Sequence, residues 1–403
     1  MGNTVIPRRQ GGSYTTIEFE NCEVKTLEKH DLENLTVGRS ELAAASVGNY
    51  ALFAGGRAYS GGAYYSPVVD AYNISLIHST PTELNAGRLE LAATGGQGYA
   101  LFGGGFGSKG SDNYYSTVDA YSENLVHTMP DELSEGRYRL AATTNGTYSL
   151  FAGGQNYYTD TNFATVDAYD NNLVHSTAAD LTAERARLAA TRVANYALFA
   201  GGLWYKEGSG YGRRNVDVYN DSLVHSTAAD LYDTVDYLGA TSLKNYAIFN
   251  SWDNWIDVYD SNLAKMTPIY WAQGGSHLAA TTNGCFALFG GGGYGSRFTS
   301  RLAGLDKNLV FHQFEDLSEA RGELAATTVG NYALFGGGSS PTTTATVDCY
   351  EYVEKDLELT LYKGTRYKFQ GMDAEATVEA DIETKTIATP ATGYIKLKKV
   401  TLS

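Results

Sequence analysis

The chain has 403 residues, and its 45 Asp and Glu against 30 Lys and Arg give a formal net charge of −15. This acidity argues against nucleic acid and against anionic membrane surfaces as partners, because both are negatively charged and select basic proteins. Hydrophobic residues make up 43% of the chain, which is enough for a sizeable core and excludes a largely disordered protein.

Three cysteines, Cys22, Cys285 and Cys349, show no spacing typical of a zinc module, and they are too few for a disulfide scaffold. The first residues lack the apolar run of a secretory signal, and no run approaches the roughly 18 apolar residues of a membrane-spanning helix. We therefore expect no membrane insertion. The location stays open between the cytoplasm and a virion or cell surface reached by a non-classical route.

An internal repeat organises most of the chain. The triplet Leu-Ala-Ala recurs at spacings of 40 to 50 residues, with one Leu-Gly-Ala variant, and it marks seven repeats that we number one to seven in chain order. The triplets begin at Leu42, Leu91, Leu140, Leu188, Leu238, Leu278 and Leu324. Periods of this length are typical of propellers and other repeat architectures.

Each repeat is expected to hold the same strands in the same order. The Ala-rich strand at the triplet is followed by a tight turn and an aromatic-Ala-Leu-Phe strand, as in 99–102, which a Gly pair usually ends. A Val-Asp-Ala-Tyr strand follows, as in 118–121, and then a short strand with Leu-Val-His, as in 125–127. Short alternating strands between turn residues predict a four-stranded meander. One such sheet cannot bury both faces, but a ring of seven can.

The sequence therefore predicts an all-β protein, a seven-bladed β-propeller of four-stranded blades with a small C-terminal β appendage. The register of residues 27–42 matches that of 125–140 without a gap, so the N-terminal segment is expected to supply the outer strand of the last blade. This interpretation divides the chain into a lead-in at 1–26, the propeller at 27–352 and the appendage at 353–403. In an alternative closure, residues 357–363 supply that outer strand instead.

A strand that ends in Gly-Gly and is followed by a Val-Asp-x-Tyr strand at this period resembles kelch-type propellers. So does the Arg that precedes the first strand at Arg39, Arg88, Arg137 and Arg321. The resemblance covers residues 27–350 and implies a fold rather than an activity. Kelch repeats usually carry Trp in the fourth strand, where this chain has Val-His. The regular repeats are also similar to kelch-like proteins of gut Firmicutes and their prophages, which implies a surface or tail-fibre component.

No catalytic constellation, cofactor or metal site is expected. Because a His of the fourth strand and an Asp of the third recur in most repeats, we interpret both as structural, with each Asp bonded to a backbone N–H or to the recurrent Arg. These residues are His78, His127, His175, His225 and His312, and Asp70, Asp119, Asp167, Asp217, Asp257 and Asp348. No acid specific to one repeat stands out as lining the centre, where a glycosidase needs a carboxylate pair. Asp112, Asp160 and Glu207 in the loops stay open.

The connection between the second and third strands differs most between repeats. It is rich in Tyr, Trp, Ser, Gly and Asn, a composition typical of antibody loops and of sites where rings stack on sugars. In a four-stranded meander these loops emerge on one face, as does the inter-blade loop with Trp271. The residues predicted to bind ligand are Tyr59, Tyr64, Tyr65, Phe106, Tyr114, Tyr115, Tyr157, Tyr158, Trp204, Tyr205, Tyr211, Trp252, Trp255 and Tyr294.

From this face we predict a non-catalytic binding module that recognises a surface glycan or surface protein, with 353–403 attaching it to a larger particle. In a competing interpretation the loop aromatics fold back and only cap the propeller. Two other classes stay open because fold does not decide function. One is a carbohydrate-active enzyme of the kelch epimerase or oxidase type with a site in the central depression, and the other is a structural scaffold in a multiprotein particle.

Overall fold

The computed structural model describes residues 6–9, 15–18, 25–59, 62–96, 98–108, 113–206, 209–234, 238–251, 254–271, 275–294, 297–354, 358–361, 367–370, 378–380 and 399–402. Every regular element in these residues is a β-strand and none is a helix, so the prediction of an all-β protein is confirmed. No helix of membrane-spanning length and hydropathy occurs in this part of the chain. The chain divides into two compact units, Lys29–Glu351 and Met1–Glu28 with Tyr352–Ser403.

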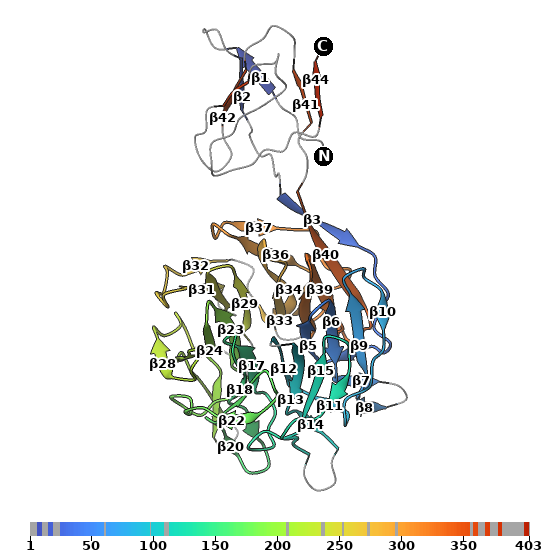
Figure 1. The fold of residues 1–403 in the computed structure, drawn as a ribbon, viewed down its shortest axis with the longest axis vertical. Helices are drawn as coiled ribbons and strands as arrows, with labels where there is room; N and C mark the ends of the chain where they lie inside the picture. Colours follow the sequence, from blue (N-terminus) through green and yellow to red (C-terminus); the bar gives the residue numbers. More distant parts are fainter. Residues whose placement is uncertain are drawn as a thin grey trace. The chain divides into compact units, whose positions relative to one another are not determined.

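In Lys29–Glu351 the described residues form seven main sheets with the same order of four strands, one sheet for each repeat (Figure 1). The first strands are β5 (Ala43–Val47), β12 (Ala92–Gly96), β17 (Ala141–Thr144), β23 (Ala189–Val193), β29 (Gly239–Leu243), β33 (Ser276–Thr282) and β38 (Ala325–Val329). The second strands are β6 (Tyr50–Ala54), β13 (Tyr99–Gly103), β18 (Ser149–Ala152), β24 (Tyr196–Ala200), β30 (Tyr246–Asn250), β34 (Phe286–Tyr294) and β39 (Tyr332–Gly336).

The third and fourth strands complete these sheets. The third strands are β9 (Val69–Asn73), β15 (Val118–Ser122), β21 (Val166–Tyr169), β27 (Val216–Tyr219), β31 (Trp255–Asp260), β36 (Leu302–Asp306) and β40 (Val347–Glu354). The fourth strands are β10 (His78–Ser79), β16 (His127–Thr128), β22 (His175–Thr177), β28 (His225–Ala228), β32 (Ile269–Tyr270), β37 (Phe311–Gln313) and, for repeat seven, β3 (Lys25–His30). In repeat six, β35 (Arg297–Phe298) also pairs with β34.

The first strands of successive repeats lie next to one another. Strand β5 contacts β12, and the contacts continue through β17, β23, β29 and β33 to β38, which in turn contacts β5 (Figure 1). The alternate buried positions of these strands carry small side chains, such as Ala43 and Ala45 in β5 and Ala92 and Thr94 in β12, which allow this close approach.

Neighbouring sheets pack through a repeated pair of a glycine and a phenylalanine. A Cβ added at Gly103, the last residue of β13, would lie 2.8 Å from the ring of Phe151 in the next sheet. The same relation holds between Gly336 of repeat seven and Phe53 of repeat one, again at 2.8 Å. A larger residue at these glycines would meet the buried ring, which would have to shift to admit it. The pair occurs in repeats two, six and seven, whereas the position of the glycine is held in the other repeats by Ala54, Ala152, Ala200 and Asn250.

In most repeats a buried network of charged residues connects the segment that enters the first strand to the sheet of the next strands. Asp119 accepts a hydrogen bond from Arg88 Nη2 at 2.6 Å and from the backbone N–H of Asn85 at 2.9 Å, and its other contact is His127 Nε2 at 2.6 Å. The same set surrounds three further aspartates, Asp70, Asp167 and Asp217. These contacts agree with the predicted bonds to the Arg and to a backbone N–H at these four aspartates. Asp257 instead lies 2.7 Å from Lys265 and accepts from Tyr232 N, and His312 lies 3.1 Å from Asp306.

The charge of the network depends on its basic members. Burial alone would raise the pKa of Asp70, but Arg39, together with hydrogen bonds from Thr36 and His78, holds the pKa of this carboxyl below its usual value. Asp70 is therefore a buried carboxylate stabilised by its partners, and removing either member of the Arg–Asp pair would leave an uncompensated charge in the core.

The sheet of repeat seven takes its fourth strand from the N-terminal segment. Strand β3 lies beside β40, and Lys29 Nζ is 2.9 Å from Asp348. In the register of 27–42 against 125–140, Lys29 occupies the place of His127, so a lysine completes this network instead of a histidine. The alternative outer strand, at 357–363, overlaps β41 (Glu358–Leu361), which pairs in parallel with β44 (Lys399–Leu402).

The other unit joins the two ends of the chain. Its sheet has the order β1 (Ile6–Arg9), β2 (Thr15–Glu18), β42 (Tyr367–Gln370) and β43 (Val378–Ala380), in which β2 and β42 run parallel. Strands from the lead-in and from the C-terminal segment therefore share one sheet, whereas the sequence interpretation treated 1–26 and 353–403 as separate segments.

Candidate functional site

The variable loops and the segments that enter the first strands meet at one end of the sheets. In repeat one, β4 (Arg39–Ser40) pairs with β7 (Arg57–Tyr59), which pairs with β8 (Ala63–Tyr65). In repeat two, β11 (Arg88–Leu89) pairs with β14 (Phe106–Gly107), and single bridges make the same connection in repeats three and four. We call this end the loop face.

The predicted ligand-binding residues differ in exposure. The exposed ones are Tyr59, Tyr64, Tyr157, Tyr158 and Tyr211. The half-buried ones are Tyr65, Phe106, Trp204, Tyr205 and Trp255. Tyr114 and Tyr115 are buried, so these two lie beneath the surface rather than on it. Trp252 and the side chain of Tyr294 lie outside the described residues, as do Asp112 and Glu207.

An aromatic cluster runs across the loop face from repeat one to repeat three. The ring centroids of Tyr65 and Phe106 are 5.6 Å apart, those of Phe106 and Tyr114 are 5.5 Å apart, and those of Tyr114 and Tyr138 are 5.3 Å apart. Tyr158 meets Tyr114 edge-on at 5.8 Å and is 69% exposed. The buried rings therefore support an exposed one, which lowers the entropy that Tyr158 would lose on contact with a ligand.

A second aromatic group lies on the hairpin of β25 (Leu203–Lys206) and β26 (Ser209–Gly212) in repeat four. The rings of Trp204 and Tyr211 are 5.7 Å apart. The hairpin is tied to β20 (Thr161–Asn162), because the Asn162 amide donates to Tyr205 O at 2.5 Å and accepts from Tyr205 N at 3.1 Å. Two variable loops are thus held in one arrangement.

Two tryptophans of repeat five, Trp255 and Trp271, differ in their surroundings and exposure. The ring centroid of Trp255 is 4.8 Å from that of Tyr232 and 5.2 Å from that of Tyr270, and both tyrosines are exposed. These three rings form a third aromatic group. Trp271, expected on the same face, is only 6% exposed and packs on Phe289 at 5.9 Å. The backbone N–H of Trp271 donates to Asn254 O at 2.7 Å, directly before β31, which fits the predicted place of this loop. The ring, however, fills the core between repeats five and six and is not available on the surface.

The residue before the triplet has a left-handed backbone in every repeat except repeat five, where it lies outside the described residues. Its φ is 57° at Glu41, 49° at Glu90, 57° at Arg139, 56° at Arg187, 59° at His277 of repeat six and 56° at Glu323. Four backbone hydrogen bonds of 2.8 to 3.0 Å link five of these residues in succession: Arg187 N to Arg139 O, Arg139 N to Glu90 O, Glu90 N to Glu41 O and Glu41 N to Glu323 O. Such a backbone is unfavourable for residues other than glycine, and it aligns side chains from different repeats around one point.

Glu41 is the most perturbed carboxyl group of this set. Burial, with the nearby charges of Glu90 and Glu323, raises its pKa to about 7, although Arg57 and Arg139 act in the opposite direction. Arg57 Nη2 lies 3.3 Å from Glu41, and Glu41 Oε2 is buried without a hydrogen-bond partner. A carboxyl group with this pKa is present in both protonation states near neutral pH, as general acids and bases are.

These glutamates correct one conclusion from the sequence. Acids specific to individual repeats do stand at this point of the loop face, at Glu41, Glu90 and Glu323. The signal is present in the sequence, because the position before the triplet varies among Glu, Arg, Tyr and His. Sequence comparison between repeats missed it because each glutamate looks like an ordinary exposed turn residue.

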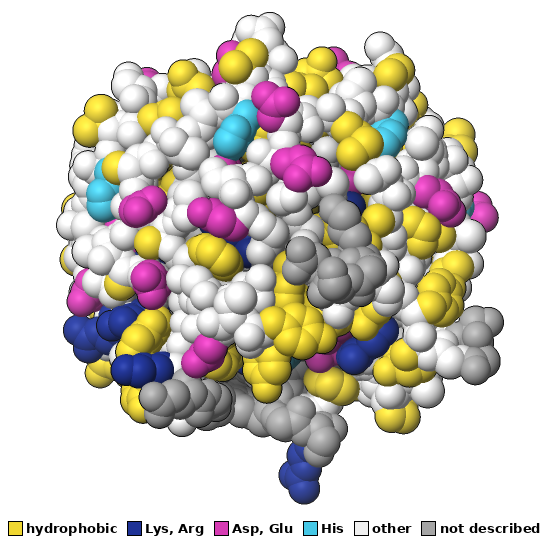
Figure 2. Space-filling model, turned by 90° about the horizontal axis from the view of Figure 1, so that it is seen from below, with side chains coloured by type: hydrophobic (Ala, Val, Ile, Leu, Met, Phe, Trp, Pro, Cys, Tyr) yellow, Lys and Arg dark blue, Asp and Glu magenta, His cyan; other side chains and the backbone are white. Residues whose placement is uncertain are grey.

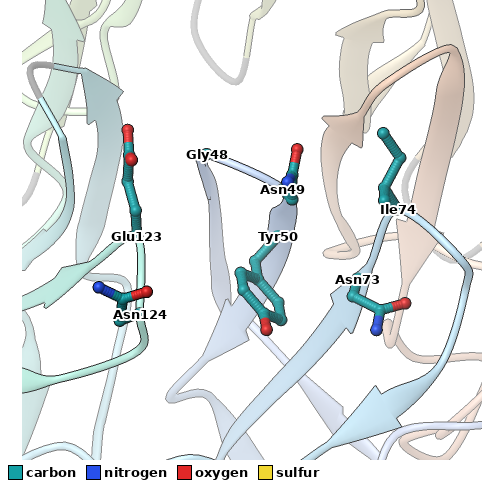
Figure 3. Close-up of a pocket in the computed structure, with 7 residues that line it drawn as sticks. All are labelled: Gly48, Asn49, Tyr50, Asn73, Ile74, Glu123 and Asn124. Atoms are coloured by element: carbon teal, nitrogen blue, oxygen red, sulfur yellow. The ribbon is translucent and has the colours of Figure 1, made fainter.

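A pocket at the opposite end of the sheets offers less chemistry. It is lined by turn residues of repeats one and two, among them Asn49, Tyr50, Asn73 and Glu123 (Figure 3). It contains none of the predicted ligand-binding residues. Among the described residues no group of His, Cys, Asp and Glu is arranged to hold a metal ion.

No protein-family model matches the sequence, and no curated protein matches it.

Proposed function

We propose that the seven sheets are blades of one closed, kelch-like β-propeller and that the loop face recognises a surface glycan or surface protein without catalysis. The proposed closure is supported by the contact of β38 with β5 and by the packing of Gly336 against Phe53, which repeats the relation between other neighbouring sheets. The kelch assignment rests on the Gly pairs and the Val-Asp-x-Tyr strands, and the surface or tail-fibre role rests on resemblance alone.

The pair of Tyr157 and Tyr158 carries the binding proposal. Both rings are exposed, at 68% and 69%, which are the largest exposed fractions among the tyrosines whose burial the structure describes. Large exposed rings on a supported platform are typical of binding surfaces, because they offer contact area at little cost in side-chain entropy. The same rings are suited to the apolar faces of sugars, while neighbouring Asn and Arg side chains bind hydroxyl groups.

The experiment is a binding screen on a glycan array and on intact cell surfaces with the purified full chain. The test variant replaces Tyr157 and Tyr158 by Ala, and the control replaces Val126 and Val174, which are equally exposed near the fourth strands, by Ala. We expect the tyrosine variant to lose binding by about tenfold or more, and the control to bind like the wild type. Equal binding by both variants, or no binding by the wild type, would refute the proposal.

A second candidate, a carbohydrate-active enzyme, is favoured by the raised pKa of Glu41 beside two further glutamates. In that function Glu41 is the proton donor or acceptor. Incubating each bound glycan with the wild type and with Glu41→Gln, and analysing the sugar by chromatography, separates the two functions. Turnover that Glu41→Gln abolishes supports the enzyme, and an unchanged sugar supports the binding module.

A further inference from the structure

Charge is distributed unevenly over the loop face. The residue before the triplet is a glutamate in repeats seven, one and two (Glu323, Glu41 and Glu90) but an arginine in repeats three and four (Arg139 and Arg187). Because β38, β5, β12, β17 and β23 are neighbours in that order, the acidic residues and the basic residues occupy adjoining parts of the face. Clusters of dark blue basic side chains beside yellow hydrophobic ones are visible in the lower half of Figure 2.

The β25–β26 hairpin of repeat four adds further cations to the part of the loop face that carries Arg139 and Arg187. Lys206 ends β25, and Arg213 and Arg214 directly follow β26. Arg214 lies 4.0 Å from Asp230, which partly neutralises it. Of the carboxylates that the structure describes, none forms an ion pair with Arg213 or Lys206. Arg192 and Lys307 also form no ion pair with a described carboxylate, so Arg213 and Lys206 are distinguished by their shared contact with one aromatic ring.

Trp204 positions both of these cations. The guanidinium carbon of Arg213 is 5.6 Å from the centroid of the Trp204 ring, and Lys206 Nζ is 5.7 Å from it. Contact with a ring face fixes a cation without neutralising it, so both charges stay available to an anion. The hydrogen bonds between Asn162 and Tyr205 hold the hairpin that carries them. Positioned cations next to an exposed ring, here Tyr211, form a site for an anionic sugar.

From these contacts we infer that the β25–β26 hairpin selects glycans that carry an anionic group, a carboxylate or a sulfate. Arg213 and Lys206 pair with the anion, and Tyr211 packs on the apolar face of the sugar that bears it. This inference rests on the proposed function and narrows its ligand class.

The test compares matched glycans by calorimetry or biolayer interferometry with the full chain. The probes are an oligogalacturonate and its carboxyl-reduced neutral form, and a sulfated oligosaccharide and its desulfated form. The variant is Arg213→Gln with Lys206→Gln. The control, Arg192→Gln with Lys307→Gln, removes the same charge near the turns at the opposite end of the sheets.

We expect the wild type to prefer at least one anionic probe over its neutral form by about tenfold or more, and the hairpin variant but not the control to lose this preference. Which anionic probe binds tells a carboxylate ligand from a sulfate ligand. Equal binding of anionic and neutral forms overturns the inference and leaves the proposed function standing. An equal loss in the control overturns it as well, because net charge then explains the preference. Binding of no glycan overturns the inference and the glycan form of the proposed function, while retained cell-surface binding would point to a protein ligand.

Discussion

The buried Arg–Asp networks and the loop face belong to the same repeat, but different features recur in them: side chains in the networks and backbone conformation on the loop face. In the networks the same side chains recur, as in Arg88 with Asp119 and Arg137 with Asp167, and each pair is fully buried. On the loop face the backbone recurs, with a left-handed φ before every triplet at which the structure describes that residue, while the side chain changes from Glu41 to Arg139. Positions with constant chemistry are therefore expected to determine stability, and positions with constant backbone but varying chemistry to determine binding.

The strongest test of this difference removes one carboxylate from the interior. We expect Asp119→Ala to lower the free energy of unfolding by about 3–5 kcal/mol, because Arg88 is then left as a buried, unpaired cation. Chemical denaturation measures the loss, and Asp180→Ala, at an exposed position, is the control with an expected effect within about 0.5 kcal/mol. A loss below about 1 kcal/mol for Asp119→Ala would show that the network adds little to stability.

The second test compares two tyrosines in contact with each other. Tyr114→Ala removes a buried ring between Phe106 and Tyr138, so we expect a loss of about 3 kcal/mol in the free energy of unfolding. Tyr158→Ala removes an exposed ring, and its expected effect on stability is within about 0.5 kcal/mol. Thermal and chemical denaturation of both variants, together with glycan-binding measurements, would distinguish a role of each tyrosine in stability from a role in ligand binding. Similar destabilisation by the two variants would mean that Tyr158 also belongs to the core.

These two tyrosines also show what the sequence could and could not predict. The all-β fold was predictable because the strand and turn signals recur in every repeat. The exposure of loop aromatics was not, because Tyr114 and Tyr158 belong to Tyr-Tyr pairs in corresponding loops of successive repeats. Tyr114 forms a β-bridge with Phe106 that turns its ring into the cluster, whereas Tyr158 lies in a turn. The difference depends on local pairing, which neither composition nor spacing reveals.

The third test concerns pH and the loop face itself. The folded-state pKa of Glu41, about 7, lies above its ordinary value of 4.5, so folding favours the protonated form. The resulting stability is fully present below about pH 4.5 and is lost as the pH rises through 7. We therefore expect Glu41→Gln to gain stability relative to the wild type over this interval, by at most about 3 kcal/mol.

Denaturation of Glu41→Gln and the wild type at pH 4.5 and pH 8 measures this gain. Glu184→Gln, which removes an exposed carboxylate, is the matched control. If the difference between Glu41→Gln and the wild type is the same at both pH values, Glu41 does not hold a proton in the folded state near neutral pH. The enzyme alternative would then lose its main support.

The smallest expected effect tests whether repeat seven is equivalent to the others. Lys29 contacts Asp348 at the place where His127 contacts Asp119, so the other networks show that a histidine fits there. We expect Lys29→His to change the free energy of unfolding by no more than about 0.5 kcal/mol. Lys29→Ala removes one partner of a buried carboxylate and is expected to cost about 1–2 kcal/mol. A loss of stability for Lys29→His as large as that for Lys29→Ala would mean that a histidine does not fit beside Asp348 as it does beside Asp119. The sheet containing β3 would then not be equivalent to the other sheets, and the proposed closure through β3 and β40 would lose support.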